Sequence, residues 1–96
     1  MTVYTVTAVE ICSDGRIKHH CIGYNTNKSD AEWEIDRYKP VSVDDKYLVI
    51  EEYREGLLPQ ARSESWYAYS LEDNEYKPCD KPLYLVENKV VNFAIG

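Results

Sequence analysis

Long apolar runs are missing from this chain, and its first residues do not predict an export signal. No stretch of about 18 apolar residues occurs, so a membrane-spanning helix is not predicted. Residues 1–12 lack a basic region followed by a long apolar segment, which argues against a secretory signal. We therefore expect a soluble, cytoplasmic protein without a membrane partner.

Basic residues are also in short supply. The 11 Lys and Arg residues are outnumbered by 17 Asp and Glu residues, which gives a formal net charge of −6. Proteins that bind phosphate backbones gain most of their non-specific affinity from clustered Lys and Arg. The charge balance argues against direct nucleic-acid binding, and it suits a protein partner with a basic surface.

Cysteine and glycine are too few and too scattered for the usual metal and nucleotide motifs. The three cysteines, Cys12, Cys21 and Cys79, include no CxxC pair, and their odd number without an export signal predicts reduced thiols. None of the four glycines opens a helix in the setting of a phosphate-binding loop. We accordingly expect no cofactor and no metal site.

The first quarter of the sequence predicts a β-hairpin. Residues 3–12 and 17–24 are rich in Val, Thr, Tyr and Ile, and Asp14-Gly15 between them is a strong signal for a two-residue turn. The side chains that such a turn pairs would share one face of the ribbon. The expected pairs are Cys12 with Ile17, Glu10 with His19, and Ala8 with Cys21.

A short helix is predicted after the hairpin. Ser29 has the side chain of an N-cap, and Glu32 three residues later completes a capping box. Pro40 ends the helix no later than the residue before it. Trp33 falls away from the stripe that this helix would bury. That stripe consists of Ala31, Ile35 and Tyr38.

Three strand-like segments follow the helix. Residues 46–55 (KYLVIEEYRE) alternate in character and are apolar on both faces at their centre, which is typical of a central strand. Residues 64–71 predict another strand, and residues 72–75 a turn. Residues 76–82 contain two prolines, so they form at most an edge strand.

These elements predict one α+β domain that spans residues 1–96. Its sheet is mainly antiparallel, and the helix lies on one face. The apolar segments 83–86 and 90–95 are expected to dock on this domain.

Four stretches in the second half form a distinctive pattern. They are VIEEYREGLLP at 49–59, Trp66-Tyr67, the pair YKP at 76–78 and KP at 81–82, and VNFAIG at 91–96. In this pattern the chain resembles a small uncharacterised family found in phage and bacterial genomes. The resemblance implies a short accessory or phage-derived protein, and it brings no catalytic residues.

An enzymatic interpretation depends on His19 and Cys21. They lie two apart on a predicted strand and project from one face, with Glu10 across the hairpin. Cys21 as nucleophile with His19 as base would make a small enzyme; the trio could also begin a metal site, although its spacing matches no standard zinc pattern. Adjacent Glu51 and Glu52 point to opposite faces and cannot act as a catalytic pair. We expect no catalytic residues, with the small enzyme as an alternative.

Tyrosine and tryptophan are abundant, whereas phenylalanine is nearly absent. Nine tyrosines and two tryptophans stand against one phenylalanine, and tyrosine suits half-wet surfaces and interfaces. Acidic residues surround Trp33 on the predicted helix, and a second acidic patch lies in the turn at 72–75. The residues expected to bind a partner are Trp33, Glu34, Asp36, Glu72 and Asp73.

These features favour a non-enzymatic protein-binding module. Together with the family resemblance, they predict a phage- or prophage-derived inhibitor or modulator of a host protein that handles nucleic acid or acts in defence. A homo-oligomeric structural component, such as a homodimer in which exposed strand edges pair, is a further alternative.

Overall fold

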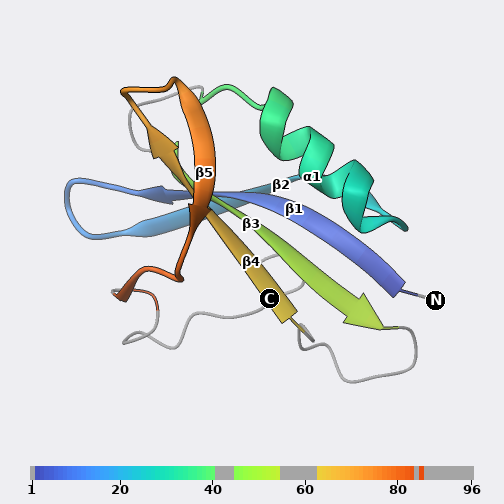
Figure 1. Cartoon of the computed structure of the whole chain (residues 1–96). Helices are drawn as coiled ribbons and strands as arrows, with labels where there is room; N and C mark the ends of the chain where they lie inside the picture. Colours follow the sequence, from blue (N-terminus) through green and yellow to red (C-terminus); the bar gives the residue numbers. More distant parts are fainter. Residues whose placement is uncertain (1, 41–44, 55–62, 84, 86–96) are drawn as a thin grey trace.

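Residues 2–40, 45–54, 63–83 and 85 are described by the computed structural model, and they form an antiparallel sheet with a helix on one face (Figure 1). Helix α1 (Lys28–Arg37) lies between β2 and β3 in the sequence. The strand order is β2-β1-β3-β4-β5. The predicted α+β class and sheet type are confirmed. The strands are β1 (Thr2–Ile11), β2 (Ile17–Asn25), β3 (Asp45–Arg54), β4 (Ser63–Ser70) and β5 (Glu75–Cys79).

The strand predicted at the centre of the sheet occupies that place. β3 pairs with β1 on one side and with β4 on the other. Its alternation puts Val49 and Glu51 on one face and Leu48 and Ile50 on the other, and all four are buried. Both faces of the sheet are therefore covered at β3, as its apolar centre predicts. The Gly-Leu-Leu-Pro run after this strand lies outside the described residues.

The first hairpin is present, but its predicted register is wrong by one residue. The Cys12 N–H donates to the carbonyl of Arg16, and the Gly15 N–H donates to the carbonyl of Cys12, at 2.9 and 3.0 Å. Three residues therefore form the loop instead of two. Gly15 has a φ of 87°, in the left-handed region. Three-residue hairpin loops commonly have a left-handed residue at this position, directly after a type I turn.

Because the loop is one residue longer than predicted, the side chains of β2 pair with different residues of β1, and residues predicted to share a face lie on opposite faces. A slip of one residue has this effect because successive side chains of a strand alternate between faces. Glu10 consequently lies on the face opposite to His19 and Cys21, so the trio considered as a metal site is not assembled. The observed pairs are Ile11 with Ile17, Glu10 with Lys18, Val9 with His19, Ala8 with His20, and Thr7 with Cys21.

Helix α1 begins two residues earlier than predicted. Asn27 is its N-cap: the backbone carbonyl accepts from Asp30 and Ala31 at 3.2 and 3.3 Å, and the side chain accepts from the Ser29 N–H at 3.4 Å. Ser29 therefore lies inside the first turn, and its predicted role as the cap is wrong. The helix ends at Arg37, before the proline, as predicted.

Two clusters of buried side chains hold the sheet together. Helix residues Ala31 and Ile35 complete the first cluster, which confirms the predicted stripe, with Tyr38 partly buried beside them. Leu85 belongs to the second cluster and is fully buried, so this part of the tail docks as predicted. The remaining members are Val6, Ala8, Leu48, Ile50 and Tyr76 on the helix face, and Val9, Val49 and Trp66 on the opposite face.

No described helix has the length and apolar character needed to cross a membrane.

Candidate functional site

The five residues predicted to bind a partner are divided between the two flanks of α1. Trp33 and Glu34 lie on the flank that faces β2. Asp36 lies near β4, and Glu72 and Asp73 lie in the turn between β4 and β5. The predicted set therefore forms two neighbouring sites rather than one.

An open cavity of about 330 Å³, the α1–β2 cavity, lies between the helix and the edge strand. Its lining residues are Ile22, Trp33, Glu34, Arg37 and Tyr38. Trp33 is 56% exposed, and the guanidinium carbon of Arg37 is 4.4 Å from the centroid of its ring. This is the geometry of a cation–π contact. The cavity thus combines aromatic and apolar walls with one carboxylate and one guanidinium.

Gly23 of β2 brings the strand backbone directly against Glu34. A Cβ atom at Gly23 would lie 2.6 Å from Oε2 and 2.8 Å from Oε1 of Glu34, closer than real side chains allow. Glu34 is half-buried, and its Oε2 atom is buried without a hydrogen-bond partner among the described residues. The sequence predicts an acidic surface residue here, and the packing of α1 on β2 encloses it instead.

The other flank of α1 meets the β4–β5 turn. The Lys39 ammonium donates to the carbonyl of Asn74 at 3.4 Å. Burial raises the pKa of Tyr67 on β4, and the carboxylates of Glu32 and Asp36 raise it further. Both carboxylates therefore lie close enough to β4 for their charge to act on the phenol.

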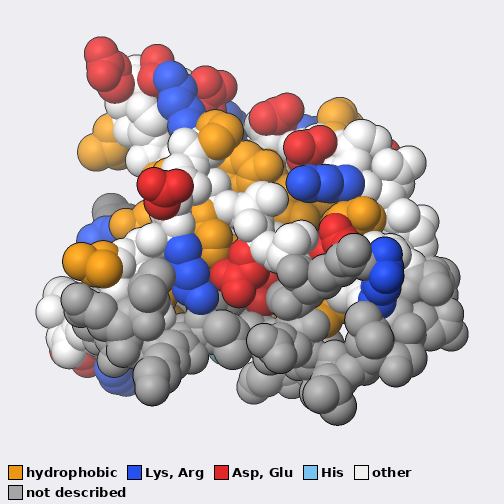
Figure 2. All heavy atoms as spheres, turned by 60° about the horizontal axis from the view of Figure 1, so that its bottom comes forward, with side chains coloured by type: hydrophobic (Ala, Val, Ile, Leu, Met, Phe, Trp, Pro, Cys, Tyr) orange, Lys and Arg blue, Asp and Glu red, His pale blue; other side chains and the backbone are white. Residues whose placement is uncertain are grey.

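The exposed acidic residues of this flank and of the turn form a surface, the acidic ridge. Its members are Glu32, Asp36, Glu72, Asp73 and Glu75. Figure 2 shows Asp and Glu side chains gathered along the upper margin of one face of the molecule, with apolar side chains exposed beside them. The ridge therefore joins negative charge from two segments that are distant in the sequence.

Asp73 and Lys77 form the ion pair of the turn. Lys77 bonds to the Asp73 carboxylate, and the Ser70 hydroxyl donates to the same carboxylate at 3.2 Å. The hydrogen bond from Lys77 is the main cause that lowers the pKa of Asp73, and the same bond raises the pKa of Lys77. Because both side chains are exposed, the pair shapes the turn more than it stabilises the fold.

Comparison with known proteins leaves the family of this chain open. No family model, no curated protein and no solved structure matches it. The resemblance to a phage and bacterial family stays a prediction, and function has to be inferred from the geometry of the surface.

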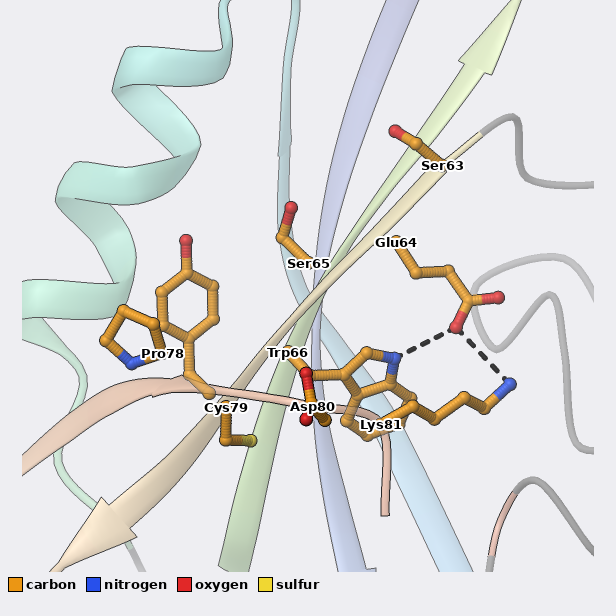
Figure 3. Close-up of a pocket in the computed structure, with 9 residues that line it drawn as sticks. Ser63, Glu64, Ser65, Trp66, Pro78, Cys79, Asp80 and Lys81 are labelled. Atoms are coloured by element: carbon orange, nitrogen blue, oxygen red, sulfur yellow. Dashed lines mark hydrogen bonds and ion pairs between the residues drawn. The ribbon is translucent and has the colours of Figure 1, made fainter. Parts of the chain in front are cut away.

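A second hollow, the β4–β5 cavity, was not predicted from the sequence. It measures about 600 Å³ and lies beside the β4 residues Ser63–Ser65, beyond the last β4–β5 pair, Trp66 with Cys79 (Figure 3). Glu64 Oε1 accepts from the Trp66 indole at 2.9 Å and lies 3.3 Å from the Lys81 ammonium. These three polar groups thus hold one another in place at the edge of the cavity.

The cysteine alternative gains no support from the geometry. Burial and the carboxylate of Asp80 raise the pKa of the Cys79 thiol, which disfavours the reactive thiolate. The exposed Cys21 thiol donates to the carbonyl of Gly23 at 3.4 Å. Within the described ranges, no three His, Cys, Asp or Glu side chains are grouped as a metal ion needs. The small enzyme stays a prediction.

Proposed function

We propose that the protein is a non-enzymatic binding module that docks on the basic surface of another protein through the acidic ridge. It acts as a phage- or prophage-derived inhibitor or modulator. Its target is a host protein that handles nucleic acid or takes part in defence.

The contact between Lys39 and Asn74 is the observation that carries this proposal. It joins the end of α1 to the β4–β5 turn across 35 residues of sequence. The acidic flank of the helix and the acidic turn therefore lie side by side. Lys77 and Asp73 neutralise each other, and the four remaining carboxylates of the ridge outnumber the one linking lysine, Lys39, so its outward charge is mainly negative.

Electrostatic complementarity explains why such a ridge suits this class of target. Surfaces that hold a phosphate backbone present clustered Lys and Arg side chains. An acidic protein surface attracts the same groups, speeds association with them, and competes with nucleic acid for them. The negative ridge thus favours a partner whose own ligand is an anion.

Affinity capture from host lysate tests the proposal. We expect the tagged chain to retain a stoichiometric partner at low salt and to lose most of it at about 0.5 M salt, where exposed charges are screened within a few Å. Asp36→Lys and Glu72→Lys should each reduce capture about fivefold, because each places a like charge against the basic partner.

Asp80→Lys is the matched control for these reversals. It makes the same change in net charge at an exposed position beyond the opposite end of β5 from the turn. Capture should survive in this variant. A partner that binds Asp36→Lys and Glu72→Lys as well as the natural chain, or binds equally in high salt, would rule out docking through the ridge.

A further inference from the structure

The α1–β2 cavity contains an acid whose hydrogen-bonding capacity is not fully used. Glu34 Oε2 is buried and accepts no hydrogen bond from the described residues. Enclosing a carboxylate oxygen without a donor is costly, because the group has given up water without replacement. Because Oε2 is closed to solvent, a donor from outside can reach this carboxylate only through its other oxygen, where Glu34 lines the cavity.

Gly23 maintains the space in which this carboxylate lies. With a Cβ at 2.6 and 2.8 Å from its two oxygens, any other residue would push the carboxylate away from β2. The carboxylate is the far end of a flexible side chain, so it would move before the backbone did. The position and charge of Glu34 in the cavity thus depend on a glycine opposite it.

The walls of the cavity suit a long side chain that ends in a cation. Ile22 and Tyr38 offer apolar surface for methylene groups, and the exposed ring of Trp33 offers a face that attracts positive charge. Arg37 already lies over that ring at 4.4 Å, which shows that the ring accepts a cation. The volume of about 330 Å³ lies at the small end of ligand pockets, which run from about 300 Å³ upwards.

We propose that the α1–β2 cavity binds a lysine side chain of the protein partner, with the ammonium on the Glu34 carboxylate at Oε1, the oxygen that is not enclosed, and the methylene chain along Trp33, Ile22 and Tyr38. This inference rests on the proposed function, because it names the anchor that a basic partner inserts beside the ridge. With Oε2 enclosed, the carboxylate offers a ligand a single oxygen, which suits a compact ammonium better than the planar fork of arginine, which favours two acceptors side by side.

Asp30 and Arg37 should affect this binding site in opposite directions. Asp30 lies four residues before Glu34, one turn along the same side of α1, and adds negative charge. Arg37 carries positive charge and competes with lysine for the cavity. Arg37→Gln should therefore strengthen lysine binding, whereas a merely structural role for the cavity predicts no such gain.

Titration of the full chain with a capped tripeptide tests the proposal. Ac-Gly-Lys-Gly-NH₂ should shift the backbone amide signal of Gly23 and the indole N–H signal of Trp33 in nitrogen-15 NMR spectra. Saturation is expected at a Kd on the order of 1 mM, since one side chain provides little binding energy. The acetyl-lysine version, which has no charge, should bind at least about tenfold more weakly.

Glu34→Gln is the decisive variant because it keeps the shape of the side chain and removes its charge. Binding of the lysine peptide should fall by about tenfold or more. Gly23→Ala should weaken it similarly by displacing the carboxylate, and an unchanged NMR fingerprint elsewhere would show that the fold is intact. If Gly23→Ala does not fold, Glu34→Gln alone decides the question.

Several outcomes would overturn the assignment. A norleucine tripeptide that binds as well as lysine would make the cavity an apolar site, and tighter binding by the arginine tripeptide would assign it to arginine. An absence of saturable shifts, or equal binding by Glu34→Gln, would also end the proposal.

The ridge and the cavity can be tested apart from each other. Glu72→Lys should reduce capture of the partner about fivefold and leave the tripeptide titration unchanged. If the lysine peptide binds but no salt-sensitive partner is captured, the result contradicts only docking through the ridge. If a partner is captured but the lysine peptide causes no saturable shifts, the result contradicts only lysine binding in the cavity.

Discussion

Trp33 and Glu34 are adjacent residues with different surroundings. Both were predicted to bind a partner from an acidic helix surface, and the exposure of Trp33 was left open by the sequence. Trp33 is exposed and carries Arg37 over its ring, whereas Glu34 is half-buried against Gly23. One residue of helix turns a side chain by about 100°, which is enough to move it from solvent to the contact with β2.

The ion pair in the β4–β5 turn predicts a pH dependence. The folded-state pKa of Asp73 lies below its ordinary value of 3.8, so its contribution to stability is present above that pH and is lost as the pH falls through the folded value. The pKa of Lys77 is raised above 10.5, so its contribution is present below that pH and is lost as the pH rises through the folded value. The pair should hold the turn between these limits.

Carbon-13 NMR titration of the Asp73 carboxyl group measures this effect. In Lys77→Met its midpoint should rise toward 3.8, because the hydrogen bond and charge of Lys77 are the largest causes of the shift. Ser70→Ala should raise it less, since the Ser70 hydroxyl is a smaller cause. A larger rise in Ser70→Ala would show that the hydroxyl, and not the ion pair, determines the acidity of this turn.

At the scale of elements, the start of α1 shows how a local signal can be ambiguous. Asn27 and Ser29 are both good capping residues, and the capping box Ser29 with Glu32 favours the second. Asn27 has an extended backbone, and its carbonyl and side chain both accept bonds from the first turn. The end of β2 at Asn25 leaves Asn27 at the position where the chain enters the helix.

Asn27→Ala should destabilise the fold by about 1 kcal/mol, because the Ser29 N–H in the first turn loses its side-chain acceptor. Urea denaturation at equilibrium measures the change in the free energy of unfolding. Ser29→Ala is the matched control and should cost less than half as much, since the exposed bond from its hydroxyl to Asn27 does not cap the helix. If the two variants lose the same free energy of unfolding, Ser29 contributes to capping as much as Asn27 does.

At the scale of the whole molecule, burial separates the residues that hold the fold from those available for binding. Ile35 is 2% exposed between α1 and the sheet, whereas Trp33 is 56% exposed on the same helix. A chain of 96 residues has a total stability of roughly 5–14 kcal/mol, so a single core side chain represents a large share of it.

Ile35→Ala should therefore lower the free energy of unfolding by about 2–5 kcal/mol through lost burial and a cavity. Trp33→Ala should cost at most about 1 kcal/mol, because it removes mainly the exposed contact with Arg37. Thermal and urea unfolding of both variants provide the measurement. A loss of more than about 2 kcal/mol in Trp33→Ala would show that Trp33 supports the fold, and it would then no longer serve as a clean probe of the cavity.

The predictions from sequence were most accurate where a property depends on a few neighbouring residues. The alternation of residues 46–55 placed a central strand that is observed as β3, and the two prolines in 76–82 placed an edge strand that is observed as β5. Asp14-Gly15 correctly located a hairpin. Its register was missed because Gly15 closes a three-residue loop, and local sequence does not distinguish the two loop lengths.

By itself, the amino-acid sequence determined the fold class, the elements and the excess of negative charge, because periodicity, turn residues and composition act over short stretches of chain. The tertiary structure alone decided which charges meet. Gly23 and Glu34 come from different elements, and Lys39 and Asn74 lie 35 residues apart. Their contacts depend on how α1 packs on the sheet, and that packing is a property of the assembled core rather than of any local pattern. For this reason the acidic ridge and the α1–β2 cavity became visible only in the folded chain.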